Sequence, residues 1–172
     1  MSNLEERFIN RLKELAAGQN RGALASLRRG LGQPPGTVAD MYRYVEPFLG
    51  ELDSGARFKE PAFYLVAALF ALHPKSTDEG NVGTHLAKTR TKNGEDALER
   101  RFTALLAAHP DDLPDYLRQT VSFLKSKEEP VNWLQLIKDL QYWDKRDNPK
   151  YSVQKRWAQE FWRKNQPADS AG

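Results

Sequence analysis

The chain has 172 residues, of which 40% are hydrophobic and none is cysteine. Its size suits one domain with a real core, and the lack of cysteine excludes a disulfide framework, thiolate catalysis and thiolate-bound metal sites. The net charge is +3 and the pI is about 9.1, which is compatible with a surface that binds a polyanion. No apolar run approaches the roughly 18 residues that span a bilayer, so we expect a soluble, cytoplasmic protein with no membrane partner.

Apolar residues recur at helical spacing along nearly the whole chain, and no segment reads as a convincing strand. Glycines and prolines interrupt this pattern near residues 30–35, 50–55 and 74–83, where helices should end. The pattern therefore predicts an all-α fold, a compact bundle of eight or nine helices.

The second predicted helix separates leucines from arginines. Its apolar stripe consists of Leu24, Leu27 and Leu31, and its arginines are Arg21, Arg28 and Arg29. No acidic residue occurs from Leu15 to Ala39. Because these arginines lack an acidic partner nearby in the sequence, we predict that they bind an external anion.

The segment from Phe63 to Leu72 is apolar on all sides, which predicts a central helix buried by its neighbours. Pro61 lies near its expected start, where a missing N–H costs little. Residues 74–94 are polar and glycine-rich, and we expect a long connection there around a short helix at residues 82–88.

We assign residues 1–165 to a single helical domain and allow for two lobes within it, residues 1–80 and 94–165. Residues 166–172 are small and polar, and they read as a disordered tail.

The signals of an enzyme are weak. The three histidines are His73, His85 and His109. None forms an HExxH motif, and none follows an arginine by five residues, as in one class of helical nuclease. The acidic cluster is Asp111, Asp112 and Asp115. It lies at a predicted helix start, where carboxylates complement the free N–H groups, so we expect no catalysis, metal or cofactor.

All four tryptophans fall between residues 133 and 162, interleaved with lysine and arginine. Residues 145–164 include seven basic and two acidic residues, a net charge of +5. On a helical projection Trp157 joins the apolar face, and Trp162 lies at the border with a cationic face. Phosphate neutralisation beside aromatic rings is typical of nucleic-acid binding.

We therefore predict that basic side chains contact a nucleic-acid backbone. The candidates are Arg21, Arg28, Arg29, Arg100, Arg101, Arg118, Lys125, Lys145, Arg146, Lys155, Arg156 and Arg163. Trp162 is a candidate for stacking on a base, with a structural role as an equally weighted alternative. Arg100 and Arg101 have acidic neighbours in the sequence, so simple solvation weighs as much as binding for that pair.

Four segments carry a family resemblance: ALASLRRGLG at 23–32, ERRFTALLAA at 99–108, WLQLIKDLQYWD at 133–144 and VQKRWAQEFW at 153–162. Together they resemble the CasB family, the small subunit of the type I-E CRISPR surveillance complex called Cascade. The likeness runs from the first helix to Trp162.

This resemblance implies an all-helical, non-catalytic protein that joins Cascade as a head-to-tail pair. The implied partners are guide RNA, target and displaced DNA strands, the backbone and large subunits of Cascade, and a second copy of the chain. The implied role is to steady the R-loop in antiviral defence, with Arg28, Arg29 and the basic residues of 145–156 as the best candidates for backbone contacts.

Other classes stay open at this stage. The chain could be a scaffold whose basic faces dock acidic proteins without any affinity for nucleic acid. A helical nuclease with an unrecognised site, or a helix-turn-helix regulator, is the weaker alternative.

Overall fold

The computed structural model describes residues 3–148 and 152–163. Within these ranges the chain forms nine α-helices and no strand, which confirms the predicted all-α fold. The α-helices are α1 (Leu4–Ala17), α2 (Arg21–Arg28), α3 (Tyr42–Leu49), α4 (Glu60–Leu72), α5 (Val82–Ala87), α6 (Glu95–Leu106), α7 (Leu113–Ser126), α8 (Trp133–Leu140) and α9 (Val153–Phe161). Three short 3-10 helices are η1 (Ala39–Met41), η2 (Ser54–Lys59) and η3 (Trp143–Lys145). None of the described helices is long and apolar enough to cross a membrane.

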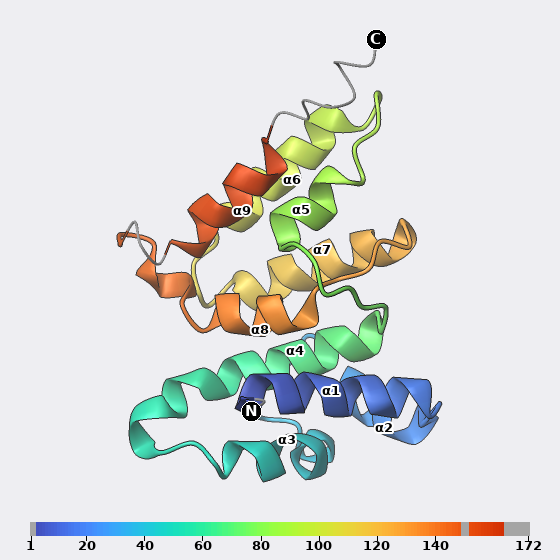
Figure 1. Cartoon of the computed structure of the whole chain (residues 1–172), viewed down its shortest axis with the longest axis vertical. Coiled ribbons are helices and arrows are strands. Elements are labelled where there is room, and N and C mark those ends of the chain that lie inside the picture. The colour runs from blue at the N-terminus through green and yellow to red at the C-terminus, as the bar shows by residue number, and fades with distance from the viewer. Residues whose placement is uncertain (1–2, 149–151, 164–172) are drawn as a thin grey trace.

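The helices form two groups along the long axis of the molecule (Figure 1). Helices α1 to α4 occupy one end, and α5 to α9 occupy the other. Helix α4 joins the groups, because it contacts α2 and α3 in its own group and α7 and α8 in the other. The buried side chains of both groups form one hydrophobic cluster. The division into two lobes therefore stays a prediction.

Helix α4 is the buried centre that its sequence predicts. Nine of its residues are buried, among them Phe63, Val66 and Phe70, which are fully shielded from solvent. Pro61 occupies the first turn, as expected. The C-cap after the last helical residue is His73, whose Nε2 lies 2.6 Å from the carbonyl oxygen of Glu129. This contact ties the end of α4 to the segment that follows α7.

Side-chain caps fix the starts of five helices. The capping residues of these α-helices are Asn3, Asn20, Asn81, Asn132 and Ser152, and each accepts a hydrogen bond from the backbone N–H of the third residue of its helix. Several of these helices have eight or nine residues, which is too short for stability in isolation. Each cap contributes about 1 kcal/mol to the stability of its helix, and packing against the other helices must supply the remaining stability.

Helices α5 and α9 pack very closely, and the reason is Gly83. A Cβ atom at this position would lie 1.9 Å from the carbonyl oxygen of Trp157, so a side chain there would collide with the backbone of α9. The predicted short helix at 82–88 is confirmed as α5. His85, which the sequence places in a polar connection, is instead buried with 1% exposure, in a helix that packs against α9.

Candidate nucleic-acid interface

Helix α7 presents a cationic face to solvent. It buries Leu117, Val121 and Leu124 and exposes Arg118 and Lys125. The two exposed cations are seven residues apart, which places them on one side of the helix. Neither forms an ion pair with a carboxylate in the part of the chain that the structure describes.

Arg101 of α6 packs on a ring of α7. Its guanidinium carbon lies 4.6 Å from the centre of the Phe123 ring on α7. The ammonium of Lys127 lies 5.7 Å from the same ring. A cation over an aromatic face is held in place while its outer side stays available to solvent. Arg100 is exposed next to this contact, and neither arginine has a carboxylate partner among the described residues.

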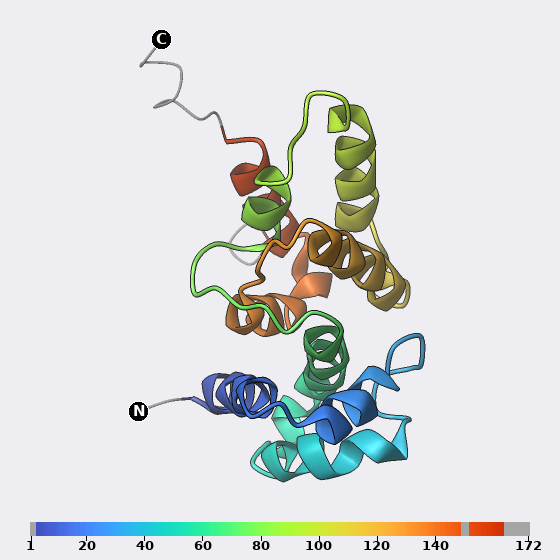
Figure 2. The same cartoon turned by 90° about the vertical axis from the view of Figure 1, so that its right-hand side faces the viewer.

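The loop after α2 continues this surface past α7. Gly32 adopts a φ of +77°, a conformation that favours glycine. A Cβ atom at Gly32 would lie 2.8 Å from Nη1 of Arg118, so the guanidinium rests close to the loop backbone. Figure 2 shows the loop, α7 and α6 one above the other along one side of the molecule. We use the name α6–α7 surface for four exposed cations of α6 and α7, namely Arg100, Arg101, Arg118 and Lys125.

The arginines of α2 are less free than the sequence indicates. Arg29 forms an ion pair with Asp40. The expectation that Arg29 lacks a carboxylate partner is therefore wrong, because Asp40 lies one residue beyond the acid-free stretch and folds back to it. Arg28 donates from Nη1 to the carbonyl oxygen of Ala71, 3.3 Å away, which ties α2 to α4. Arg21 is exposed and has no ion pair within the described ranges.

The basic residues near the C-terminal end form a second group. Arg146 donates from Nη2 to the carbonyl oxygen of Ala108 at 2.7 Å, so it contacts the segment that follows α6. A guanidinium nitrogen of Arg156 lies 3.7 Å from the buried carboxylate of Asp139.

Arg163 and the lysines complete this group. Arg163 pairs with Glu160 at 2.6 Å, on an exposed part of the chain. Lys145 and Lys155 are exposed without an ion pair among the described residues. We call Lys145, Lys155 and Arg156 the α9 surface. Lys150, Lys164 and the predicted tail 166–172 lie outside the described residues.

Trp162 makes structural contacts, and its stacking on a base stays a prediction. It is 44% exposed, while its ring packs 5.4 Å from Phe102 and its indole N–H donates to Glu99 at 3.1 Å. Trp133, Trp143 and Trp157 are buried. The alternation of tryptophan with basic residues therefore reflects core packing at three of the four positions.

The predicted cations thus divide between two sides of the molecule. In Figure 2, α6 and α7 lie on the right and α8 and α9 lie further to the left. The sequence has its strongest positive charge in residues 145–164, with a net charge of +5. In the structure the arginines without a carboxylate partner among the described residues include Arg100, Arg101 and Arg118, which belong to the packed helices α6 and α7, where the sequence signal was weak.

The histidines and acids occupy structural positions. Burial is the main cause that lowers the pKa of His85 to about 4, and Lys88 adds to it. Its Nε2 accepts a hydrogen bond from the backbone N–H of Asn132 at 2.9 Å. Asp115 lies in the first turn of α7, as predicted. Across the described residues no group of three or more histidines and acids is arranged to hold a metal ion.

Known proteins are similar to this chain in sequence and fold. The family model of the CRISPR-associated protein Cse2 matches residues 23–162. The CRISPR-associated protein Cse2 of Thermus thermophilus is 40% identical over 161 residues, which are 91% of this chain and 89% of that protein. The crystal structure of CasB from Thermus thermophilus matches with a TM-score of 0.79 and 35% identity, over 94% of this chain and 99% of that one.

A further match is to a chain of a structure described as a CRISPR RNA-guided surveillance complex. Its TM-score is 0.76 at 28% identity, over 93% of this chain and 92% of that chain. The region matched by the family model runs from α2 to the end of α9, and the similarity in fold extends over nearly all helices. The chain therefore belongs to the Cse2 family of CRISPR-associated proteins, also called CasB.

Proposed function

We propose that this chain is the small subunit of a CRISPR RNA-guided surveillance complex, Cascade. In that complex it binds the sugar–phosphate backbones of RNA and DNA strands and helps to steady the R-loop. The match to a chain of such a complex supports this assignment. Recognition of the target is left to base pairing between guide and DNA, so this chain needs no sequence preference and no catalytic site.

The α6–α7 surface is the observation that carries the proposal. It comprises four exposed cations of two packed helices, and none has a carboxylate partner in the described ranges. A cation that is already paired must give up its partner before it can bind a phosphate. An unpaired cation has no such cost, and its binding releases counterions from the nucleic acid, which supplies affinity without sequence information.

The α9 surface supports contact with a second strand. Lys145 and Lys155 are exposed and unpaired within the described residues, and half of the Arg156 side chain is exposed despite its contact with Asp139. Because α7 and α9 lie on different sides of the molecule (Figure 2), two strands bound there would be held apart. Separation of strands is what an R-loop requires.

A salt titration tests the proposal. Binding of fluorescently labelled single-stranded DNA is measured by anisotropy from about 50 to 200 mM salt for the parent chain and for R118A/K125A. The loss of two phosphate contacts should reduce the slope of log K against log salt by about 1.4 and weaken binding throughout. The matched control is R7A/R11A, which removes two ion-paired arginines from α1, on the other side of the molecule.

The outcomes separate the candidate functions. If both double variants reduce the slope equally, binding follows net charge and the α6–α7 surface has no special role. If the parent chain shows no affinity for DNA or RNA at the lowest salt, the chain is a protein-docking scaffold, and the proposed contact with nucleic acid is wrong.

A further inference from the structure

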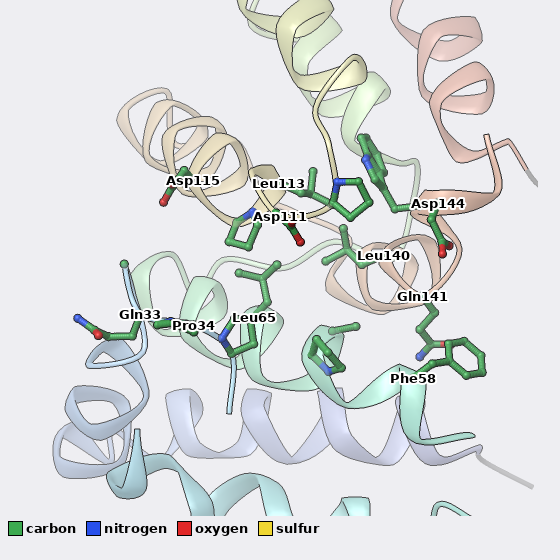
Figure 3. Close-up of a pocket in the computed structure, with 17 residues that line it drawn as sticks. Gln33, Pro34, Phe58, Leu65, Asp111, Leu113, Asp115, Leu140, Gln141 and Asp144 are labelled. Atoms are coloured by element: carbon green, nitrogen blue, oxygen red, sulfur yellow. The ribbon is translucent and has the colours of Figure 1, made fainter. Parts of the chain in front are cut away.

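A cleft of about 600 Å³ lies where α4 faces α7 and α8 (Figure 3). Its walls come from the loop after α2, the start of α4, the turn before α7 and the segment after α8. Figure 3 shows Leu65 of α4 on one wall and Leu113 and Leu140 on the opposite wall. The volume lies within the roughly 300–1,000 Å³ typical of clefts that bind a ligand.

The charge of this cleft is opposite to that of the α6–α7 surface. Asp111, Asp115 and Asp144 line it, and no lysine or arginine does so among the described residues. Asp115 and Asp144 form no ion pair in the described ranges, and Asp111 lies 3.5 Å from His109. The charged side chains that line the cleft among the described residues are thus all acidic, whereas the whole chain has 26 basic and 23 acidic residues. The cleft adjoins the α6–α7 surface, because Arg118 lies against the backbone of Gly32 in one wall, but its own carboxylates would repel phosphates, so it is not itself a phosphate site.

An exposed aromatic ring marks the cleft as a protein-binding site. Phe58 lies on its rim and is 58% exposed. Exposed aromatic side chains beside an apolar recess are typical anchors of protein interfaces. The lining also includes the prolines Pro34, Pro35, Pro61, Pro110 and Pro114. Because proline restricts the backbone, these walls need little ordering when a partner binds.

We infer that this cleft docks a segment of another protein in which an apolar side chain is flanked by lysine or arginine. The apolar side chain lies between Leu65 and Leu140, and the flanking cation pairs with Asp115 or Asp144. Charge complementarity selects this occupant, because three carboxylates without a lining cation attract a basic segment and the leucines require an apolar group. In the proposed complex the segment belongs to a different subunit.

Peptide selection on the full chain tests the chemistry of the occupant without any nucleic acid. Random peptides displayed on phage are selected on the parent chain, on D115K/D144K and on the control E79K/D96K. The control is matched, because Asp96 lies in the first turn of α6 as Asp115 does in α7, and Glu79 and Asp144 are both exposed outside α-helices. Both variants therefore change the net charge by the same amount, and each replaces one acidic residue in the first turn of an α-helix by lysine.

The expected peptides combine leucine, isoleucine or phenylalanine with lysine or arginine. They should bind D115K/D144K about tenfold or more weakly than the parent, and bind the control as the parent does. Failure to select any peptide, or peptides that bind D115K/D144K undiminished, would overturn the inference.

Photocrosslinking identifies the occupant in the assembled complex. The photoreactive residue p-benzoylphenylalanine replaces Phe58 in one sample and Tyr42 in a control, since Tyr42 is also an exposed aromatic but lies outside the cleft. The expected product from position 58 joins this chain to a basic peptide of another protein subunit. A product with RNA, with DNA or with a second copy of this chain contradicts the inference.

The two proposals can fail separately. The inference rests on the proposed function only for the identity of the complex, because the peptide selection contains no nucleic acid and leaves Arg118 and Lys125 unchanged. Selected peptides that depend on the cleft, together with a chain that does not bind DNA, would retain the docking site and reject the proposed contact with nucleic acid. The reverse result would reject the docking site alone.

Discussion

The indole N–H of Trp157 donates a hydrogen bond to Oδ2 of Asp139, 2.8 Å away, in the core between α9 and α8. Both residues are buried. Gln135 donates to the other carboxylate oxygen at 2.8 Å, and Arg156 approaches it from the surface at 3.7 Å. Burial raises the pKa of Asp139, while these donors oppose the shift. The carboxylate of Asp139 on α8 therefore links the two helices through its hydrogen bond with Trp157 and helps to orient α9 on α8.

Replacing Trp157 with phenylalanine should destabilise the protein by about 2 kcal/mol, because a buried carboxylate loses a donor and the core loses volume. The control W162F removes an indole that also donates to a carboxylate, that of Glu99, but at an exposed site. We expect it to cost less than about 1 kcal/mol. Urea unfolding measures both values, and equal losses would show that the buried hydrogen bond adds nothing.

The helices could be predicted because their signals are local. The apolar segment from Phe63 to Leu72 identifies the buried centre without knowledge of its neighbours. Ser152 is recognisable as a cap from its place before α9, and its Oγ accepts from the N–H of Lys155. Glycine and proline mark the helix ends. Each of these features depends on residues within a few positions along the chain.

The proposed binding surface could not be predicted in the same way, because whether a cation is paired depends on partners that are distant in sequence. Arg146 binds the carbonyl of Ala108, which is 38 positions away. Arg101 packs on Phe123 of the next helix. The sequence around residues 145–164 has the stronger positive charge, yet folding places three of its arginines beside a carboxylate or a carbonyl. The net charge of a segment therefore overstates the number of cations in it that are free to bind a phosphate.

A second prediction concerns Gly83. In G83A the new methyl group overlaps the backbone carbonyl of Trp157, which cannot rotate away, so α5 must shift off α9. We expect a loss of about 3 kcal/mol or more. Thermal unfolding gives the comparison with G22A in α2, where the nearest atom to the new Cβ lies 3.8 Å away. That variant should be unchanged or gain up to about 1 kcal/mol, since alanine favours helix more than glycine does. Similar melting temperatures for the two variants would contradict the close packing.

A third prediction follows from His85. Burial lowers its pKa from 6.5 to about 4 in the folded chain. The unfolded chain therefore binds the extra proton first, and the stability falls as the pH drops from about 6.5 to 4, by about 3 kcal/mol in total. Above about pH 6.5 the residue contributes no pH dependence.

The variant H85Q separates this effect from other groups. Glutamine can accept the hydrogen bond from Asn132 but does not titrate, so the loss of stability between about pH 6.5 and 5 should disappear. The hydrogen bond from Arg7 lowers the pKa of Glu51, so that pair loses its contribution only below pH 4.5. Urea unfolding across this range measures the slope, and an identical slope in H85Q would rule out His85 as its source.

The fourth prediction uses the ion pair between Arg29 and Asp40 to measure how much an ion pair with a carboxylate reduces the contribution of an arginine to the affinity for single-stranded DNA. Arg29 must leave Asp40 before it can bind a phosphate, so R29A should weaken binding of single-stranded DNA by less than about twofold. In the background of D40N the arginine is free, and the same substitution should weaken binding by about fivefold or more. Both residues are largely exposed, so the effects on stability are small.

Anisotropy titrations of the parent, R29A, D40N and the double variant complete this cycle. An equal cost of R29A in both backgrounds would mean that the carboxylate does not restrain the arginine, and that pairing in the structure does not decide which cations bind. A larger cost in D40N would support the selection of Arg118 and Lys125 as primary contacts, because they already have the freedom that D40N gives to Arg29.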